Sequence, residues 1–424
     1  MDFTIFFNFL FPLLLFFQQL SILVLSTWEW SVVMGHPLNT SDIKKSNQRL
    51  VLDRLYQLKT TSRTQLAKEL SMSKPAISDN LSPLLDTGIV EEIGEGTVGP
   101  SGGRKQILLQ FNAQNRYIVT IDLSSNSVIF ALSDLAGKIV NTFEIFVSDS
   151  TPVESCQEML CNGVRVLQQS FAACADRIYC IAIGAPGTFD ENGTLVACNA
   201  NCTCPPWYLV DLRPRLTQEF GLPVIVYNNI KSATLGEWIQ GSCRQEPALM
   251  YLSTGLGIGA GILLNGHIFS GQYFDAGEIY DYVDSDNPEH TGNFESRVCL
   301  DHLKTACAGI PDGPFSDPQS ITLEKIVSAY HQGQPQVCQI VKTTCRRLAV
   351  MAYNQMNFIS LRLICFAGEY APFWECFREE LLCLYAKNGR PAPDVRKTEL
   401  GKFGSTTGLI YLARQSYFNE ICSK

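Results

Sequence analysis

Charged residues are scarce in this sequence, and lysine and arginine are absent from its first 43 residues. Only 17% of the 424 residues are charged and the net charge is -8, which excludes a uniformly basic nucleic-acid-binding protein. With 46% hydrophobic residues, the chain can form two or three domains with cores of their own. The composition therefore predicts a globular chain whose basic residues are concentrated locally.

The 16 cysteines lack the spacing of a disulfide framework or of a metal site. Most lie inside apolar segments such as "LICFAG" and "LLCLY", which is typical of buried, reduced thiols in a cytosolic protein. One cluster, Cys198, Cys202 and Cys204, has no matching His or Cys pair downstream, so a metal site there is the less favoured alternative. We expect a cytoplasmic protein without a bound metal.

The first thirty residues are apolar and can be interpreted in two ways. The run "DFTIFFNFLFPLLLFFQQLSILVL" is long enough to span a bilayer, but no basic residue precedes it as in a signal peptide. Pro12 and the pair Gln18 and Gln19 make it a poor membrane span. We therefore favour a start at Met34 over a membrane tether, which makes residues 1–33 a hydrophobic leader.

The basic residues are concentrated between Lys44 and Phe111, with ten Lys and Arg against seven Asp and Glu. Apolar residues recur there at helical spacing from Asn47. Ser62 is a suitable N-cap for a second helix in "TTSRTQLAKELSM", and Ser73 for a third in "KPAISDNLSPLLDTG". Two short helices joined by a tight turn are typical of a helix-turn-helix.

Two alternating segments, "IVEEIGEG" and "QILLQFN", then predict a β-hairpin around the loop "TVGPSGGRK". This hairpin would be a wing, with Arg104 and Lys105 at its tip able to reach phosphates or a minor groove. The residues of the third helix expected to face the major groove are Lys74, Ser78 and Asn80. We predict a winged helix-turn-helix DNA-binding domain over residues 34–112; the alternative is a plain three-helix bundle with a solvated charge pattern.

Residues 113–424 alternate apolar strands with helical segments, which predicts an α/β architecture. The segment "ALMYLSTGLGIGAGILLNGHIFSG" predicts a strand, a glycine-rich loop and a second strand that ends at a hairpin turn. The glycines of the loop are Gly255, Gly257, Gly259 and Gly261. Such a loop can bring backbone N–H groups close to a phosphate, but a tight strand connection also requires glycine.

In this order, the helix-turn-helix followed by "GGRK", "GAPG", "NNIKSATLGE", "STGLGIGAGILLNGHIFSG" and "AGE" resembles the ROK family (repressors, open reading frames and kinases). The resemblance implies an actin-like, ribonuclease H-like sugar-kinase fold of two lobes, with a sugar in the cleft and often a dimer. It implies that lobe 1 covers about 113–227 plus the C-terminal helix, and lobe 2 about 228–405. The N-terminal winged helix-turn-helix marks the regulator branch.

Measured against this resemblance, the kinase machinery is altered at several positions. Asn229 stands where the family's kinases have the Asp that takes a proton from the sugar, and an amide cannot do this at neutral pH. The first phosphate loop has Ser124 and Ser125 in place of both glycines. Glu369 places a carboxylate where the family has a Gly-Gly near the nucleotide. We therefore expect neither kinase activity nor an ATP cofactor.

The family's zinc site also lacks its ligands, since Asp281 stands for its His and Asn293 for its last Cys, so no zinc is expected. The retained positions are those whose side chains bind sugar hydroxyls in the family, namely Asn228, Glu278 and Glu295. Asn229 and Asp281 can still make hydrogen bonds to a sugar. The resemblance therefore implies a sugar-binding site made of these five residues.

Together these features predict a sugar-responsive DNA-binding regulator, most simply a repressor, whose kinase-like body is not an enzyme. Its partners would be a double-stranded DNA operator, a small sugar effector and a second copy of the chain in a homodimer. The alternative is an active ATP-dependent sugar kinase, for which Asp122 and the glycine-rich loop are retained. A third possibility is that the body is only a dimerisation scaffold.

Overall fold

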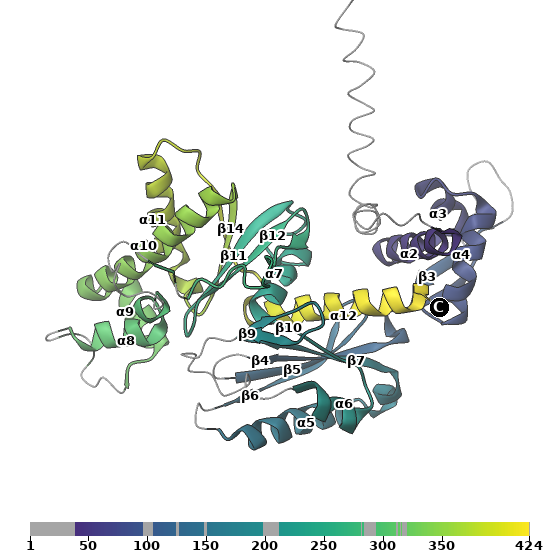
Figure 1. The fold of residues 1–424 in the computed structure, drawn as a ribbon, viewed down its shortest axis with the longest axis horizontal. Helices are drawn as coiled ribbons and strands as arrows, with labels where there is room; N and C mark the ends of the chain where they lie inside the picture. Colours follow the sequence, from purple (N-terminus) through teal and green to yellow (C-terminus); the bar gives the residue numbers. More distant parts are fainter. Residues whose placement is uncertain are drawn as a thin grey trace, which may run out of the picture. The chain divides into compact units, whose positions relative to one another are not determined.

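Figure 1 shows a computed structural model, which describes residues 39–95, 105–123, 127–147, 151–197, 212–280, 282–283, 294–310, 313, 315 and 320–423. The interpretation of residues 1–33 as a leader or membrane anchor lies outside these ranges. Within them, no helix is long and apolar enough to cross a membrane.

The chain divides into two compact units. The first comprises Met1–Asn115 together with Ser416–Lys424, and the second comprises Arg116–Gln415. The boundary after Asn115 lies close to the one expected after residue 112. The expectation that the whole C-terminal helix belongs to the body is corrected, because the last residues of that helix belong with the first unit.

The first unit combines helices with a three-stranded antiparallel sheet in the order β1-β3-β2. Its elements are α2 (Thr40–Leu58), β1 (Thr60–Ser62), α3 (Arg63–Glu69), α4 (Lys74–Asp86), β2 (Val90–Glu95) and β3 (Ile107–Phe111). The order of helices followed by a hairpin is that of a winged helix-turn-helix.

Local capping explains where these helices begin. The Ser62 hydroxyl accepts the N–H of Gln65 at the start of α3, and the Ser73 hydroxyl accepts the N–H of Ala76 at the start of α4. Gly88, with a φ of +71°, follows the end of α4 in a conformation that suits glycine. The predicted N-caps are therefore confirmed. The helices share a core that includes Leu52, Leu55, Leu66, Ile77 and Leu81, all fully buried.

The C-terminal helix α12 (Gly404–Ser423) completes this unit with its last turns. The ring of Phe418 contacts those of Tyr56 and Phe111, at centroid distances of 6.0 and 5.8 Å. The Tyr417 hydroxyl donates a hydrogen bond to Asn115. Residues from the two ends of the chain therefore form one core.

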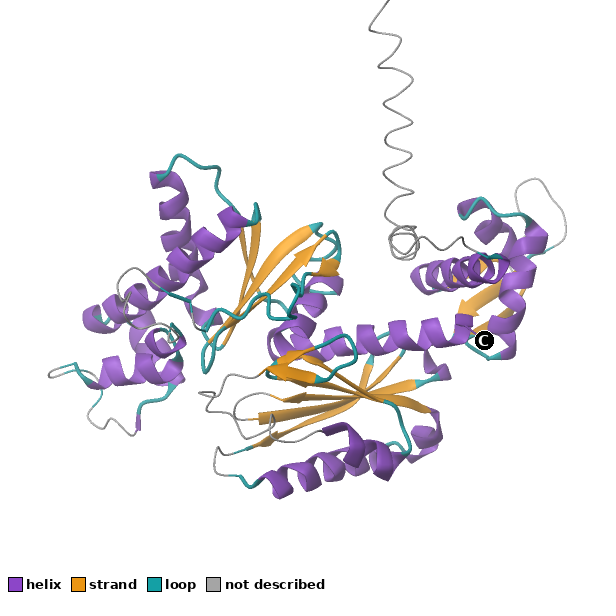
Figure 2. Cartoon of the chain, viewed as in Figure 1, coloured by secondary structure: helices purple, strands orange, loops and turns teal. Residues whose placement is uncertain are grey.

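The second unit contains two five-stranded sheets (Figure 2). The first has the order β10-β7-β4-β5-β6; β4, β7 and β10 are parallel to one another, and β5 and β6 form an antiparallel meander with β4. Its strands are β4 (Tyr117–Leu123), β5 (Ser127–Asp134), β6 (Ile139–Phe146), β7 (Ile178–Ala185) and β10 (Val224–Asn228). Helices α5 (Val153–Ser170) and α6 (Leu212–Phe220) cover one face (Figure 1), and β8 (Thr188–Phe189) pairs with β9 (Leu195–Ala197).

The second sheet has the order β13-β12-β11-β14-β15. Its strands are β11 (Ala248–Thr254), β12 (Gly259–Leu264), β13 (His267–Ile268), β14 (Leu363–Gly368) and β15 (Asp394–Lys397). Helix α7 (Asn229–Ile239) packs against one face. A larger core on the other face joins the sheet to α8 (Leu300–Ala308), α9 (Leu323–His331), α10 (Pro335–Phe358) and α11 (Trp374–Lys387).

The local sequence determines the connection between β12 and β13. Asn265 and Gly266 both have positive φ, 53° and 78°, as a tight hairpin turn requires, so the turn predicted there is confirmed. The altered phosphate loop expected at Ser124 and Ser125 lies outside the described residues. Two helix-covered sheets in one unit agree with the two-lobed α/β body that the resemblance implied.

Candidate functional site

The candidate sugar site is built around the junction of β10 and α7. Asn228 is the last residue of β10 and the N-cap of α7, and it is only 6% exposed. Its side-chain oxygen accepts the N–H of Lys231 at 2.8 Å, and its amide nitrogen donates to the Gly187 carbonyl at 2.9 Å. The amide group therefore fixes the start of α7, and each of its polar atoms retains one further hydrogen-bonding position for a ligand.

Asn229, the first residue of α7, has a role that an ionised Asp could not fill. Its side-chain amide donates a hydrogen bond to the carbonyl of Leu123, the last residue of β4, at 3.2 Å. A carboxylate has no proton to donate and would face the carbonyl oxygen with a negative charge. The Asn229 amide thus supplies a donor that connects α7 to β4.

Asp122, on β4, lies at one end of a chain of buried hydroxyl groups. Its Oδ1 is 2.8 Å from the Ser405 hydroxyl of α12, which is 2.9 Å from the Ser232 hydroxyl of α7, which is 2.8 Å from the Asn229 carbonyl. These three contacts need three protons, and the two hydroxyls supply two. All three contacts can therefore be hydrogen bonds at the same time only when the Asp122 carboxyl group is protonated. Burial raises the pKa of Asp122 to about 7, and the Ser405 hydroxyl lowers this pKa when it donates to the carboxylate.

Lys231 is a member of this site that the sequence analysis missed. It is 4% exposed, and its ammonium group donates to the Phe274 carbonyl at 2.6 Å. Burial lowers the pKa of Lys231, while the negative charges of Glu278 and Asp275 act in the opposite direction. The sequence signal that could have identified Lys231 is its position as the only basic residue in the segment "NNIKSATLGE".

Glu278, the next predicted residue, is half-buried and borders a cavity of about 240 Å³ lined mainly by apolar side chains. The preceding Gly277 has a φ of +96°, and a Cβ there would lie 1.9 Å from the Ala260 carbonyl. Close contact with β12 therefore fixes the position of Glu278. Asp281 lies outside the described residues, so its predicted contact with a sugar remains a prediction.

Glu295 contacts the glycine-rich loop. It accepts the N–H of Ile258 at 2.9 Å, and burial raises the pKa of Glu295 while this hydrogen bond lowers it. A Cβ at Gly257 would lie 3.1 Å from the Glu295 carboxylate. One oxygen of Glu295 is therefore committed to the loop, and its predicted contact with a sugar would use the other.

The glycines on the β12 side of the loop allow close packing of α7. A Cβ at Gly259 would contact Ile230 at 3.2 Å, and one at Gly261 would lie 1.8 Å from the Thr234 hydroxyl. Gly255 and Gly257 instead face carboxylates, those of Glu369 and Glu295. The described structure thus gives each glycine of the motif a reason that requires no bound ligand.

The C-terminal end of α7 is anchored by Glu237, which is fully buried. Its carboxylate accepts five hydrogen bonds, from the Ser242 N–H and hydroxyl, the Thr398 hydroxyl, and the N–H groups of Glu399 and Leu400. Segments far apart in the sequence are therefore connected through one side chain.

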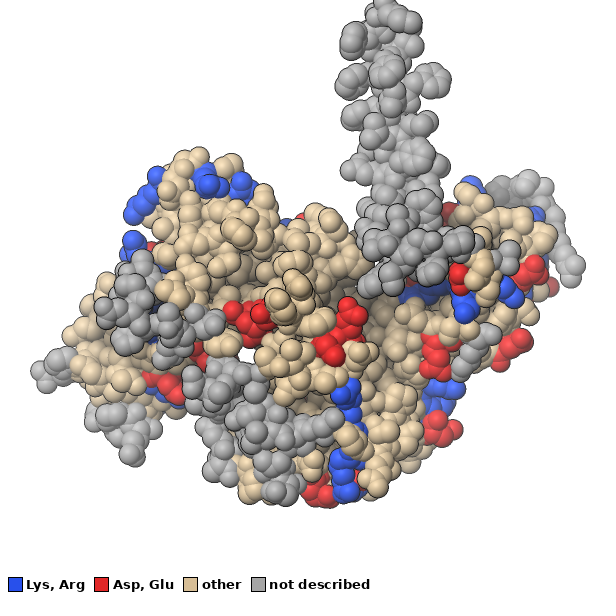
Figure 3. Space-filling model, in the orientation of Figure 1, with Lys and Arg blue, Asp and Glu red and all other residues tan. Residues whose placement is uncertain are grey.

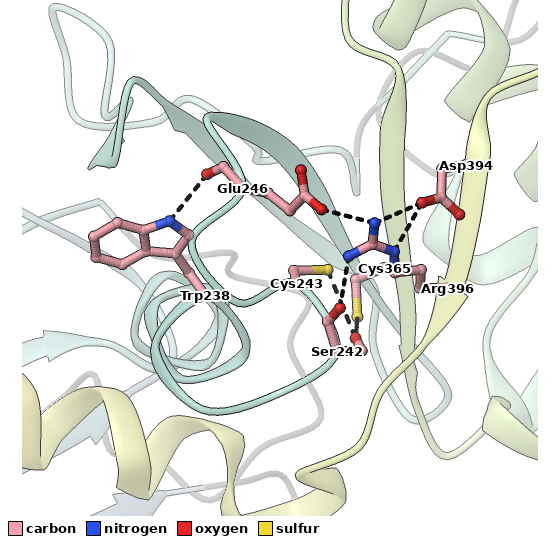
Figure 4. Close-up of polar contacts among 7 residues, drawn as sticks. All are labelled: Trp238, Ser242, Cys243, Glu246, Cys365, Asp394 and Arg396. Atoms are coloured by element: carbon pink, nitrogen blue, oxygen red, sulfur yellow. Dashed lines mark hydrogen bonds and ion pairs between the residues drawn. The ribbon is translucent and has the colours of Figure 1, made fainter. Parts of the chain in front are cut away.

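Figure 4 shows a second clamp on the segment that follows α7. The guanidinium of Arg396, on β15, donates to the Ser242 carbonyl and to Glu246, both at 2.7 Å, and to Asp394 at 2.8 Å. The indole N–H of Trp238 donates to the Glu246 carbonyl at 3.0 Å. Together with Glu237, this clamp fixes the register of α7 against the second sheet.

The predicted DNA-contacting residues have different environments. Lys74 and Ser78 are exposed on α4, as a groove-facing residue must be. Asn80 is only 6% exposed and its amide donates to the Ala76 carbonyl at 2.7 Å, so the expectation that it faces the groove is wrong. Lys105 is exposed and lies 3.3 Å from Glu95, and Arg104 is outside the described residues.

Acidic and basic side chains are interspersed over the first unit on the face that Figure 3 shows. Several bases of this unit are paired with acids, as in Arg54–Glu69 and Arg63–Glu92. Among the described residues, no group of three His, Cys, Asp or Glu could hold a metal. Asn293 and Asp281 lie outside them, so the expected loss of zinc remains a prediction.

Comparison with known proteins gives consistent results. A model of the ROK family matches residues 118–416. Over 358 residues the chain is 28% identical to a xylose repressor of Caldicellulosiruptor bescii, which covers 81% of this chain and 88% of that protein. It is 23% identical over 345 residues to the DNA-binding transcriptional dual regulator NagC of Escherichia coli, covering 78% and 82% of the two chains.

Solved structures agree with this fold. A ROK family transcriptional regulator, a homolog of the E. coli MLC protein, aligns with a TM-score of 0.69 at 22% identity over 88% of this chain and 98% of that one. A ROK family glucokinase from Streptomyces griseus, in complex with glucose and AMPPNP, aligns with a TM-score of 0.56 at 18% identity over 70% and 99%. The predicted fold, a winged helix-turn-helix joined to an actin-like sugar-kinase body, is confirmed.

Proposed function

We propose, because the chain belongs to the ROK family, that it is a sugar-responsive DNA-binding transcriptional regulator and most simply a repressor. The observation that carries the proposal is the presence, in one chain, of a helix-turn-helix with capped helices and a ROK body. A helix-turn-helix reads DNA, which a sugar kinase does not require. Similar proteins that extend over most of this chain are named xylose repressor and NagC.

The effector of the proposed regulator is a small sugar held near the N-terminus of α7. Asn228, Lys231 and Glu278 supply an amide, an ammonium and a carboxylate in one neighbourhood. This mixture of donors and acceptors suits the hydroxyl groups of a sugar. Xylose and N-acetylglucosamine are the first sugars to test, because they occur in the names of the relatives.

We further propose that the regulator works as a cytoplasmic homodimer. Two copies would place two α4 helices in successive major grooves of a pseudo-palindromic operator. For the sugar to act as a switch, it must bind one conformation more tightly than the other by several kcal/mol; a change from 1:99 to 99:1 needs about 5.5 kcal/mol.

DNA binding to the region upstream of its own gene, measured at two salt concentrations and with a panel of sugars, tests the proposal. We expect specific retention that one sugar alters, with an affinity that falls steeply as the salt concentration rises. Lys74→Ala should weaken binding to all sequences and lower the salt slope by about one, while Lys387→Ala in the second unit should change neither. Equal, weak binding to random DNA would contradict the proposal.

The competing function is ATP-dependent sugar phosphorylation. The commitment of the Asn229 amide to the Leu123 carbonyl opposes it, because no carboxylate stands there to accept a proton. We expect no turnover above background from the protein when it is assayed with ATP, Mg²⁺ and the sugar panel. Turnover by the unaltered protein would establish the kinase and reject a purely regulatory body.

A further inference from the structure

The loop that joins β11 to β12, residues 255–258, already contacts two carboxylates of its own chain. The N–H of Ile258 donates to Glu295 at 2.9 Å. Burial raises the pKa of Glu369, and the backbone N–H groups of Glu369 itself and of Leu256 act on the pKa in the opposite direction. Glu369 is nevertheless exposed to solvent.

The backbone brings Glu369 onto the loop. Gly368, at the end of β14, has a φ of +85°, and a Cβ there would lie 2.1 Å from the Thr254 carbonyl, so only glycine fits this close approach. The next residue then lies against Gly255, which has a φ of +141°. A Cβ on Gly255 would lie 1.9 Å from Oε2 of Glu369 and 2.7 Å from its Cδ. The carboxylate therefore rests directly on the Gly255 backbone.

A glycine-rich loop with exposed backbone N–H groups is a common means of binding phosphate oxygens. Here the N–H of Ile258 donates to Glu295, and the Glu369 carboxylate lies against the backbone of Gly255. An incoming phosphate would have to displace an acceptor attached to the chain and would meet its negative charge. The loop is thus a site for an anion, and the chain supplies the anion.

We propose that Glu369 is a tethered anion that occupies the phosphate-binding position of this loop and excludes polyphosphate ligands from it. Removal of its side chain would uncover a binding site for a polyphosphate such as inorganic triphosphate or the tail of a nucleoside triphosphate. This inference does not depend on DNA binding or on the identity of the sugar.

Calorimetric titration of the full chain with inorganic triphosphate at low salt tests this inference. We expect Glu369→Gly to bind it at least about tenfold more tightly than the unaltered protein. Glu369→Gln keeps the volume and removes the charge, so its gain should be smaller. Glu379→Gln makes the same charge change at an exposed position of α11 and should have no effect.

Equal affinity of the unaltered protein and Glu369→Gly for triphosphate, whether both bind or neither does, would overturn the inference. Thermal unfolding and operator binding without triphosphate check that the variants are folded. If Glu369→Gly did not fold, Glu369→Ala would carry the test, since it removes the carboxylate and keeps the Cβ. If the unaltered protein showed no sugar-responsive DNA binding, the proposed regulator would be contradicted. The comparison of triphosphate affinities between the unaltered protein and Glu369→Gly would still test the inference.

Discussion

The two ends of α7 are held in different ways. At the C-terminal end, the buried Glu237 carboxylate accepts five hydrogen bonds, and Arg396 fixes the following turn. At the N-terminal end, the side chains of Asn229 and Lys231 are each held by one hydrogen bond, at 3.2 Å to the Leu123 carbonyl and at 2.6 Å to the Phe274 carbonyl.

The difference indicates that the two ends of α7 have different roles. A carboxylate with many charge-assisted hydrogen bonds resists displacement, because all its donors would lose their acceptor together. Side chains held by one contact can exchange that contact for a ligand hydroxyl. We therefore interpret the C-terminal end as the fixed support and the N-terminal end as the part that responds to a ligand.

The largest effect is expected at the fixed end. Glu237→Ala should lower the free energy of unfolding by about 5 kcal/mol, since several buried donors would be left without an acceptor. Urea denaturation measures this change. The exposed Glu399 provides the matched control, and Glu399→Ala should change stability by less than about 0.5 kcal/mol. Similar small effects of both substitutions would reject the idea of a fixed end.

Asp122→Asn should have a pH-dependent effect of intermediate size. Because the folded-state pKa of about 7 lies above the unfolded value near 3.9, Asp122 favours the folded state fully below pH 4, and this contribution is lost as pH rises through 7. The amide cannot ionise, so the variant should match the protein near pH 4 and exceed it by at most about 4 kcal/mol above pH 7. Urea denaturation between pH 5 and 8 measures the difference. A difference that stays constant with pH would mean that Asp122 does not hold the proton inferred from its hydroxyl contacts.

Lys231→Met should have the smallest effect on stability and a clear effect on the ligand. Loss of the ammonium–carbonyl hydrogen bond releases the Phe274 segment beside Glu278, so we expect sugar affinity to fall about tenfold, which is 1.4 kcal/mol. Calorimetric titration with the effector sugar measures it, and Lys231→Arg should retain part of the affinity. Unchanged affinity in Lys231→Met would place this residue outside the site.

Local patterns in the sequence were enough to predict the helix starts and turns. Ser62 and Ser73 cap their helices because the N-cap signal involves residues only three apart. The helical periodicity also predicts that Asn80 is buried. Asn80 shares one face of α4 with Ile77, Leu81 and Leu84, and this face is buried. The prediction for Asn80 failed because residue polarity was given more weight than position on the helix.

Contacts between distant segments were beyond sequence reasoning. The partner of Lys231 is a carbonyl 43 residues away, and that of Asn229 is one 106 residues away. The resemblance identified Asn229 and Glu369 as departures from a pattern, but only the fold shows that one donates to β4 and the other rests on Gly255. The alternation of apolar and polar residues does not predict which distant backbone group a side chain will contact.

The sharing of α12 between the units has a consequence for synthesis of the protein. The first unit emerges early from the ribosome, yet its core includes Phe418, which packs on Tyr56 and Phe111. Domains that emerge early usually fold first. Here the part expected to read DNA can complete its core only after the whole second unit has been synthesised. A nonsense mutation just before Phe418 would therefore remove part of the core of the first unit and leave every residue of the candidate sugar site in place.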